Sequence, residues 1–258
     1  MKKKQIQTGT LYVVGLGPGA EKHLTFKARE ALEQSEIIIG YKTYIELIDG
    51  LFRDKQYIST GMGEEIKRVA EAVSLTTAGK TVSLVSSGDP GIYGMAGLVL
   101  EFLHSQDQAI NLQIIPGVPA LCATAALLGA PLMHDFASIS LSDRLTPWQT
   151  ITTRLQMAAE GDFVITIYNP KSRGRQWQLT EAREILLRYR DRSTPVGIVR
   201  NAYRKDQKIT ITDLAHMLDF EVDMFTTIVI GNASTFLSGN WIVTPRGYQT
   251  KYKLNSEL

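Results

Sequence analysis

The chain has 258 residues, of which 44% are hydrophobic and 21% are charged, and its formal net charge is +2. This composition is ordinary for a globular protein and excludes a largely disordered chain. The length suits one large domain or two of modest size. A net charge this small gives no reason to expect a nucleic-acid partner.

Sequence signals for a membrane span, a secretory leader, a disulfide or a metal site are missing. No apolar run reaches the roughly 18–20 residues that a span needs, and MKKKQIQTGT has no apolar core behind its lysines. The single cysteine, Cys122, permits no internal disulfide and suits the cytoplasm. We expect it to be a small buried core residue. The four histidines have no metal-ligand spacing, so we expect no protein-bound metal.

In chain order, the first half alternates short apolar strands with helices. Strands are predicted at 11–14, 36–39, 81–86 and 112–115, and helices at 25–34, 64–78 and 94–103. Thr25 is the predicted N-cap of the first helix. Strands this apolar, separated by helices, indicate a parallel sheet covered on both faces.

The second half begins after IIPGVPALCATAALLGAPL, where two prolines precede a helix of small residues. Strands are predicted at 137–141, 163–168, 196–199 and 226–230, and helices near 148–159 and 179–189. The pattern therefore predicts an α/β protein with two domains. Residues 1–117 form a domain with a parallel sheet, and residues 118–258 form one with a mixed sheet.

Two glycine-rich loops follow predicted strands at their carboxyl ends, where open α/β sheets bind ligands. The first, GLGPGA at 15–20, has the letters of a dinucleotide fingerprint. However, the next helix is predicted to begin late, no acidic residue closes the next strand, and Pro18 removes a backbone donor. A tight turn without a ligand fits these residues better than a pyrophosphate site does.

The second loop, SSGDPGIYG at 86–94, lacks the Lys-Ser/Thr pair of a triphosphate-binding loop. In one interpretation, Asp89 only caps a helix that has Pro90 at its first position. In the other, a nearly neutral loop lined by glycines approaches a nucleoside without phosphate. S-adenosylmethionine carries such a nucleoside.

Five motifs, in order, resemble those of the tetrapyrrole methylases over nearly the whole chain. They are GLGPG (15–19), SSGDPGIYG (86–94), PGVPA (116–120), YNP (168–170) and TPRGY (244–248). The resemblance implies the class III tetrapyrrole methyltransferase fold, with the cofactor in a cleft between two α/β domains. It also implies S-adenosylmethionine as cofactor, S-adenosylhomocysteine as product, and a homodimer.

A narrower resemblance lies in HDFASISLSDRLTPW (134–148), GYKTY (40–44) and YNPKSRGR (168–175). These segments are similar to the branch that methylates C-17 of precorrin-3B or of cobalt-factor III in cobalamin biosynthesis. In that branch, methylation accompanies contraction of the macrocycle. The implied substrate is a tetrapyrrole with many carboxylates.

The resemblance carries cofactor contacts to named positions. They are Pro18, Ser87, Gly88, Asp89, Ile92, Pro119, Ala120, Tyr168, Asn169, Asn201 and Ala202. Pro119 stands where relatives have a hydroxyl residue, and Asn169 stands where many have methionine. Relatives that act on an earlier precursor carry an acid after the second strand, where this chain has Gly40 and Tyr41. Their acid–base role is therefore not transferred.

Methyl transfer from a sulfonium needs mainly alignment of the methyl group with a ring carbon, whereas ring contraction must also move a proton. Ser142, Asp143 and His134 are the candidate catalytic residues for that step. Alternatively, Ser142 and Asp143 cap the helix that contains Trp148.

Candidate substrate contacts are either cations for the carboxylates or residues that line the macrocycle. They are Lys171, Arg173, Arg175 and Arg200 for the first group, and Tyr41, Tyr44 and Thr146 for the second. For each of them a solvated or packing role is the alternative.

Three rival functions stay open. A family member that methylates RNA should show a broad basic stripe, against which the small net charge argues; a protein substrate is a further variant. A non-catalytic module would bind a tetrapyrrole or a nucleoside without methyl transfer. An NAD oxidoreductase is weakened by the missing acidic residue.

Overall fold

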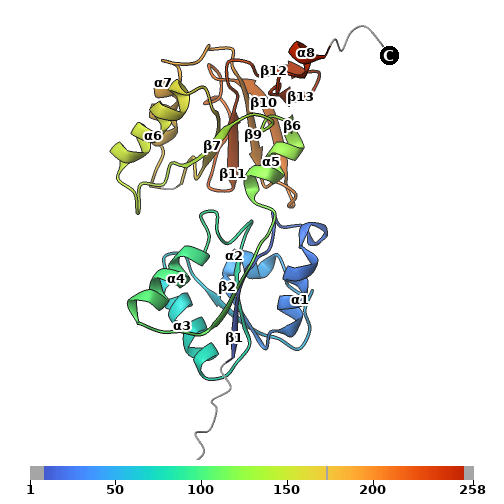
Figure 1. Ribbon diagram of the computed structural model, residues 1–258, viewed down its shortest axis with the longest axis vertical. Coiled ribbons are helices and arrows are strands. Elements are labelled where there is room, and N and C mark those ends of the chain that lie inside the picture. Colours follow the sequence, from blue (N-terminus) through green and yellow to red (C-terminus); the bar gives the residue numbers. More distant parts are fainter. Residues whose placement is uncertain (1–8, 173, 253–258) are drawn as a thin grey trace, which may run out of the picture. The chain divides into compact units, whose positions relative to one another are not determined.

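The computed structural model describes residues 9–172 and 174–252 (Figure 1). The chain divides into two compact units, Met1–Ala120 (the first unit) and Leu121–Leu258 (the second unit). Each unit has its own sheets and its own hydrophobic clusters. Every predicted strand and helix is present, with boundaries within three residues of the predicted ones.

The first unit is built on a five-stranded parallel sheet with the strand order β3-β2-β4-β1-β5. The strands are β1 (Thr10–Gly15), β2 (Ile37–Tyr41), β3 (Gln56–Thr60), β4 (Val82–Ser86) and β5 (Asn111–Ile115). The helices are α1 (Phe26–Gln34), α2 (Lys42–Glu46), α3 (Glu65–Thr77) and α4 (Ala96–Ser105), and a short 3-10 helix, η1 (Glu21–His23), precedes α1. Because the strands are parallel, all their carboxyl ends lie along one edge of the sheet.

Apolar side chains of this sheet alternate between its two faces. Leu11 and Val13 of β1 pack in a cluster with α3 and α4, whereas Tyr12 and Val14 pack in a cluster with α1. Figure 1 accordingly shows α1 on one side of the sheet and α3 and α4 on the other. The predicted N-cap is confirmed, because the hydroxyl oxygen of Thr25 accepts a hydrogen bond from the backbone amide of Ala28 at 3.1 Å.

The second unit has a mixed five-stranded sheet, β10-β9-β11-β8-β7, and a three-stranded sheet, β12-β13-β6. The strands are β6 (Gly129–Ala130), β7 (Phe136–Ser140), β8 (Val164–Tyr168), β9 (Pro195–Arg200), β10 (Lys208–Asp213), β11 (Thr226–Ile230), β12 (Phe236–Ser238) and β13 (Trp241–Val243). The helices are α5 (Ala120–Leu128), α6 (Trp148–Glu160), α7 (Gln178–Leu186) and α8 (Tyr248–Lys251). In the larger sheet β7 and β8 are the one neighbouring pair of described strands that is parallel, and the other neighbouring pairs are antiparallel.

Two hydrophobic clusters hold the second unit together. Leu155 of α6 and Leu179 of α7 pack against one face of the larger sheet. Leu128 of α5 and Ile242 of β13 pack in a separate cluster with Val164. Figure 1 shows α6 and α7 side by side on one side of this sheet.

The expectation that Cys122 is buried is wrong. Its side chain is exposed on α5. The helix turns Leu121, Ala123 and Leu128 inward, so position 122 falls on the outer face. No helix in the described part of the chain is long and apolar enough to cross a membrane.

Candidate functional site

Two loops of the first unit lie against each other where they leave the carboxyl edge of the parallel sheet. The amide of Gly88, after β4, donates to the carbonyl oxygen of Gly17, after β1, at 2.7 Å, and the reverse bond measures 3.1 Å. Both residues have positive φ, +70° for Gly17 and +66° for Gly88, which glycine adopts without strain. The two glycine-rich motifs of the sequence therefore form one structure.

A third loop, after β5, joins them through Gly117. A Cβ atom on Gly117 would lie 2.2 Å from the carbonyl oxygen of Gly88, and a Cβ on Gly15 would lie 2.6 Å from the same oxygen. Side-chain carbons do not approach backbone atoms this closely. Gly15, Gly88 and Gly117 thus bring three main-chain segments into direct contact.

The carboxylate of Asp89 ties two of these loops together. Its Oδ1 accepts a hydrogen bond from the amide of Gly91 at 2.8 Å, and its Oδ2 accepts one from the amide of Gly117 at 3.1 Å. Because α4 begins only at Ala96, Asp89 does not cap a helix. The loop is instead closed by a turn in which the amide of Ile92 donates to the carbonyl of Asp89.

The predicted cofactor residues of the first unit all lie on these three loops. They are Pro18 after β1, Ser87, Gly88, Asp89 and Ile92 after β4, and Pro119 and Ala120 after β5. A Cβ on Gly88 would lie 3.6 Å from the amide nitrogen of Ala120 and from the Cα of Pro119. The structure therefore brings the three predicted groups together.

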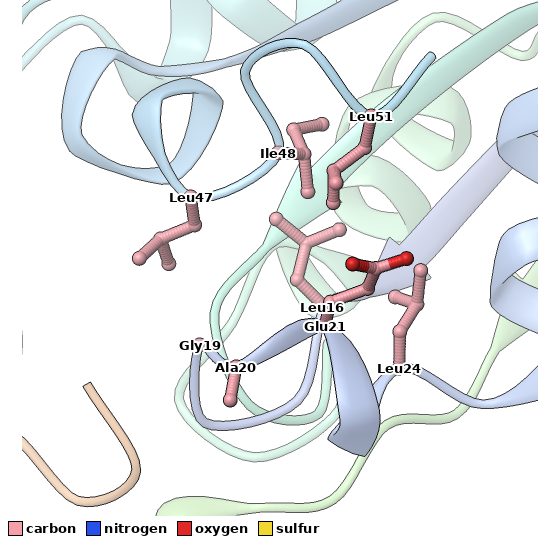
Figure 2. Close-up of a pocket in the computed structure, with 8 residues that line it drawn as sticks. All are labelled: Leu16, Gly19, Ala20, Glu21, Leu24, Leu47, Ile48 and Leu51. Atoms are coloured by element: carbon pink, nitrogen blue, oxygen red, sulfur yellow. The ribbon is translucent and has the colours of Figure 1, made fainter.

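Most of the residues that line a small hollow beside the first loop are apolar. Figure 2 shows its lining residues, Leu16, Gly19, Ala20, Glu21, Leu24, Leu47, Ile48 and Leu51. A pyrophosphate here would meet the carboxylate of Glu21, and α1 begins only at Phe26, beyond η1. The positive helix terminus that a dinucleotide site uses is therefore not placed at this loop.

Tyr41 and Tyr44 lie at the carboxyl end of β2, and their rings meet edge to face with centroids 5.3 Å apart. Arg68 of α3 lies in the same region and is only 3% exposed. Its guanidinium donates to Thr60 Oγ1 at 2.5 Å and to the carbonyl of Gly61 at 3.0 Å. Burial lowers the pKa of Arg68, which nearby acidic and tyrosine side chains partly offset. Sequence reasoning missed this buried cation.

In the second unit, the loops after the parallel strands β7 and β8 are joined by hydrogen bonds. The amide of Leu141 donates to the carbonyl of Tyr168 at 3.0 Å, and Asn169 Nδ2 donates to Ser140 Oγ at 3.0 Å. The same oxygen of Ser140 accepts the amide of Ser142 at 3.2 Å. Asn169 has a φ of +51°, an uncommon conformation that asparagine tolerates better than most residues.

Arg175 binds both of these loops from within the protein. Its side chain is 12% exposed. Its Nη1 donates to the carbonyls of Leu141 at 3.1 Å and Asn169 at 3.3 Å, and its Nε lies 4.0 Å from Asp143 Oδ1. Burial lowers the pKa of Arg175, and the Asp143 carboxylate opposes that shift. These contacts occupy the group that the sequence predicts as a ligand of substrate carboxylates.

Asp143 is also held from its other side, since Gln178 Nε2 donates to Asp143 Oδ2 at 3.2 Å. The N-cap of α6 is Pro147, and no side chain caps that helix. Ser142 and Asp143 therefore do not cap the helix that contains Trp148, which was one of the two interpretations of the sequence.

The structure does not bring His134 to the other two candidate catalytic residues. His134 precedes β7, whereas Ser142 and Asp143 follow it. A five-residue strand separates its ends by about 13 Å. The His134 side chain is 49% exposed, and its Nδ1 accepts the amide of Asp135 at 2.9 Å. The three residues do not form one catalytic group.

The remaining predicted residues are spread over the second unit. Arg200 pairs with Asp223 Oδ2 at 2.7 Å, which raises the pKa of Arg200. Asn201 follows β9 with a φ of +53°, and Ala202 packs against the cluster around Leu128. Lys171 and Thr146 are half-buried on the loops after β8 and β7, and Arg173 lies outside the described residues. No described group of His, Cys, Asp and Glu has the arrangement of a metal site.

A sequence model of the tetrapyrrole (corrin/porphyrin) methylases matches residues 10–218. The chain belongs to this family. The prediction drawn from the five motifs is therefore confirmed. The crystal structure of the methyltransferase CobJ superposes with a TM-score of 0.86 at 36% identity, covering 92% of this chain and all of that one. This similarity to CobJ confirms the predicted tetrapyrrole methylase fold.

Two tetrapyrrole methylase relatives are similar over almost the whole chain. The cobalt-factor III methyltransferase of Priestia megaterium is 53% identical over 251 residues, which are 96% of this chain and 46% of that protein. The chain thus spans about half the length of that relative. The probable cobalt-factor III C(17)-methyltransferase of Salmonella typhimurium is 50% identical over 239 residues, 92% of this chain and 99% of that protein.

Removing the hydroxyl of Tyr168 is expected to destabilise the second unit. This oxygen accepts the amide of Leu121 at 2.8 Å, a first-turn amide of α5 without a partner inside the helix. Tyr168→Phe should lower the free energy of unfolding by about 1–2 kcal/mol, measured by urea denaturation without ligands. Tyr189→Phe, at a partly exposed tyrosine, serves as the control. Equal stability of the two variants would contradict this assignment.

Proposed function

We propose that the protein transfers a methyl group from S-adenosylmethionine to C-17 of cobalt-factor III, or of its metal-free counterpart precorrin-3B, in cobalamin biosynthesis. The 50% identity with the Salmonella protein carries the proposal, because that protein's name gives both the macrocycle and the position of methylation. The contraction of the macrocycle that the narrower resemblance implies belongs to the same proposal.

The three loops of the first unit support a cofactor of this kind. Gly15, Gly88 and Gly117 let the three loops pack main chain against main chain at the carboxyl edge of the sheet, where open α/β sheets bind ligands. The only acidic side chain of the second loop, Asp89, already accepts two main-chain amides. Residues 15–20, 86–94 and 116–120 of these loops include no Lys or Arg, which suits an adenosine without phosphate better than a nucleotide.

When bound, S-adenosylmethionine supplies a methyl group that is already activated on a sulfonium. The protein then has to hold that group in line with a ring carbon, and such alignment contributes roughly 7–11 kcal/mol to catalysis in favourable cases. We assign the alignment of the cofactor to the loops after β1, β4 and β5. The cofactor roles of Tyr168, Asn169, Asn201 and Ala202 rest on the family resemblance.

Substrate carboxylates need cations, and the described contacts favour some candidates over others. Lys171 and Arg173 remain the proposed cations of the loop after β8. Arg200 would bind a carboxylate with the nitrogens that Asp223 leaves open. The contacts of Arg175 with two carbonyls favour an internal role instead. Tyr41, Tyr44 and Thr146 remain proposed contacts of the macrocycle.

The proposal also includes a homodimer that works in the cytoplasm without a nucleic-acid or membrane partner. The homodimer rests on the family resemblance, and the absence of such partners rests on the small net charge and the lack of long apolar runs. Sedimentation equilibrium of the purified protein tests the homodimer. A monomer at micromolar concentration would contradict this part.

Binding and turnover assays test the main proposal. Isothermal titration is expected to show micromolar binding of S-adenosylhomocysteine and none of NAD. With S-adenosylmethionine carrying a carbon-13 methyl group, cobalt-factor III or precorrin-3B should gain one labelled methyl at C-17, located by NMR. Binding without transfer would favour a non-catalytic module, and NAD binding alone would favour an oxidoreductase. Comparing the two macrocycles identifies the true substrate.

A further inference from the structure

Gln178 is a polar side chain that is almost completely buried at the first position of α7. The residue is 1% exposed. Its amide nitrogen donates to Asp143 Oδ2 at 3.2 Å, and its Oε1 has no hydrogen-bond partner among the described residues. A buried acceptor without a partner is costly, and Gln178 Oε1 is one of several such buried side-chain atoms among the described residues; its neutral side chain also holds the partly exposed carboxylate of Asp143.

Asp143, which Gln178 holds, is the more accessible of the two. Its side chain is 28% exposed, on the loop after β7. Its Oδ1 is 4.0 Å from Arg175 Nε, which is beyond hydrogen-bond distance, whereas the Arg200–Asp223 pair of the same unit closes to 2.7 Å. The guanidinium of Arg175 instead donates to main-chain carbonyls. Asp143 is thus fixed on one oxygen by a neutral amide, and its other oxygen remains an acceptor.

We propose that Asp143 is a catalytic proton acceptor and that Gln178 is the positioning residue that aims it. The inference rests on the proposed function. A neutral donor suits this task, because it orients the carboxylate without cancelling its charge, as a close ion pair would. Proton transfer to a positioned carboxylate needs this kind of fixed geometry.

The step is balanced without any oxidant or reductant. The S–CH3 bond breaks and sulfur keeps its electron pair, while a π pair of the macrocycle forms the new C–C bond. The macrocycle thereby gains one positive charge. In metal-free precorrin-3B, a pyrrolic N–H loses its proton to Asp143 as the C–C bond forms, and the N–H electron pair stays on nitrogen. The carboxylic acid formed passes the proton to water.

A double-mutant cycle tests this assignment. The proteins are the wild type, Asp143→Asn, Gln178→Met, the double variant, and Gln156→Met as a control at an exposed glutamine of α6. Asp143→Asn should slow single-turnover methyl transfer to precorrin-3B, the macrocycle with an N–H to lose, about 100-fold, as loss of a general base does. Gln178→Met should slow it about tenfold, in line with the loss of one hydrogen bond to a charged group. The control should match the wild type.

The decisive measurement is the single-turnover rate of the double variant. If Gln178 acts through Asp143, the double variant is no slower than Asp143→Asn, because the two effects are not additive. The KM for the macrocycle and the Kd for S-adenosylhomocysteine should stay within about twofold of wild type in all variants, since neither residue is assigned to binding. Should Gln178→Met not fold, Gln178→Leu, an apolar side chain without a donor, takes its place in the cycle.

The outcomes separate the two levels of the proposal. A wild type that methylates neither macrocycle would overturn the proposed function and this inference with it. An active wild type with multiplying effects in the double variant would overturn the inference alone. The inference would also be overturned by a Gln178 variant that reacts at the wild-type rate, or by one that changes KM and leaves the single-turnover rate intact.

Discussion

Replacing Gly117 by alanine is expected to destabilise the first unit and to abolish binding of S-adenosylhomocysteine. The new Cβ would lie 2.2 Å from the carbonyl oxygen of Gly88 and 2.8 Å from that of Gly15. Both are main-chain atoms, which cannot rotate away as the end of a flexible side chain can. Relief therefore requires the loops after β1, β4 and β5 to separate. We expect a loss of about 3 kcal/mol in the free energy of unfolding.

Gly97→Ala is the matched control for this experiment. Gly97 is the second residue of α4, and a Cβ there would meet nothing within 4 Å. In a helix, alanine is favoured over glycine by about 0.5–1 kcal/mol, so this variant should be slightly more stable and bind the ligand normally. Urea denaturation and isothermal titration give the two readings. If Gly117→Ala bound S-adenosylhomocysteine as tightly as Gly97→Ala, the three-loop contact would not be needed for binding.

Local sequence signals predicted the interior strands of both five-stranded sheets. β1 and β4 are buried along almost their whole length because helices cover both of their faces. Strands β3 and β10 of these sheets were not predicted, and both lie at an edge, where a strand pairs on one side only and tolerates polar residues; the edge strands β5 and β7 were predicted. The short strands β6, β12 and β13 were not predicted either. Thr25 was predictable because an N-cap is a local device that needs only the next three residues.

The candidate site was less accessible to sequence reasoning because it depends on distances between remote segments. The motifs located the glycine loops, but the contact of Gly88 with Gly117 joins residues far apart in the chain. Gln178 belongs to no pattern, since a single glutamine before an apolar helix carries no signal. A sequence also gives no information about whether an arginine faces solvent, a ligand or two carbonyl oxygens. Arg175 is the case in which this matters most.

Arg175→Met is expected to destabilise the second unit in the absence of any ligand. The substitution leaves the carbonyls of Leu141 and Asn169 without the donor that now joins the loops after β7 and β8. It also removes the cation beside Asp143. Loss of these charge-assisted contacts should cost about 2–3 kcal/mol in the free energy of unfolding, measured by urea denaturation. Arg175→Lys keeps the charge but not the planar fork, so we expect it to recover half of that loss or less.

The same variants separate an internal arginine from one that binds substrate. If Arg175 served a substrate carboxylate, Arg175→Met would unfold like the wild type and raise the KM for the macrocycle instead. Arg154→Met, at an exposed arginine of α6, controls for the loss of one positive charge and should change stability by no more than about 0.5 kcal/mol. Because the loop that Arg175 braces also carries Asp143, the Met variant should additionally slow methyl transfer under conditions where it is folded. A stable but slow Arg175→Met protein would place the arginine in the reaction itself and contradict the bracing role.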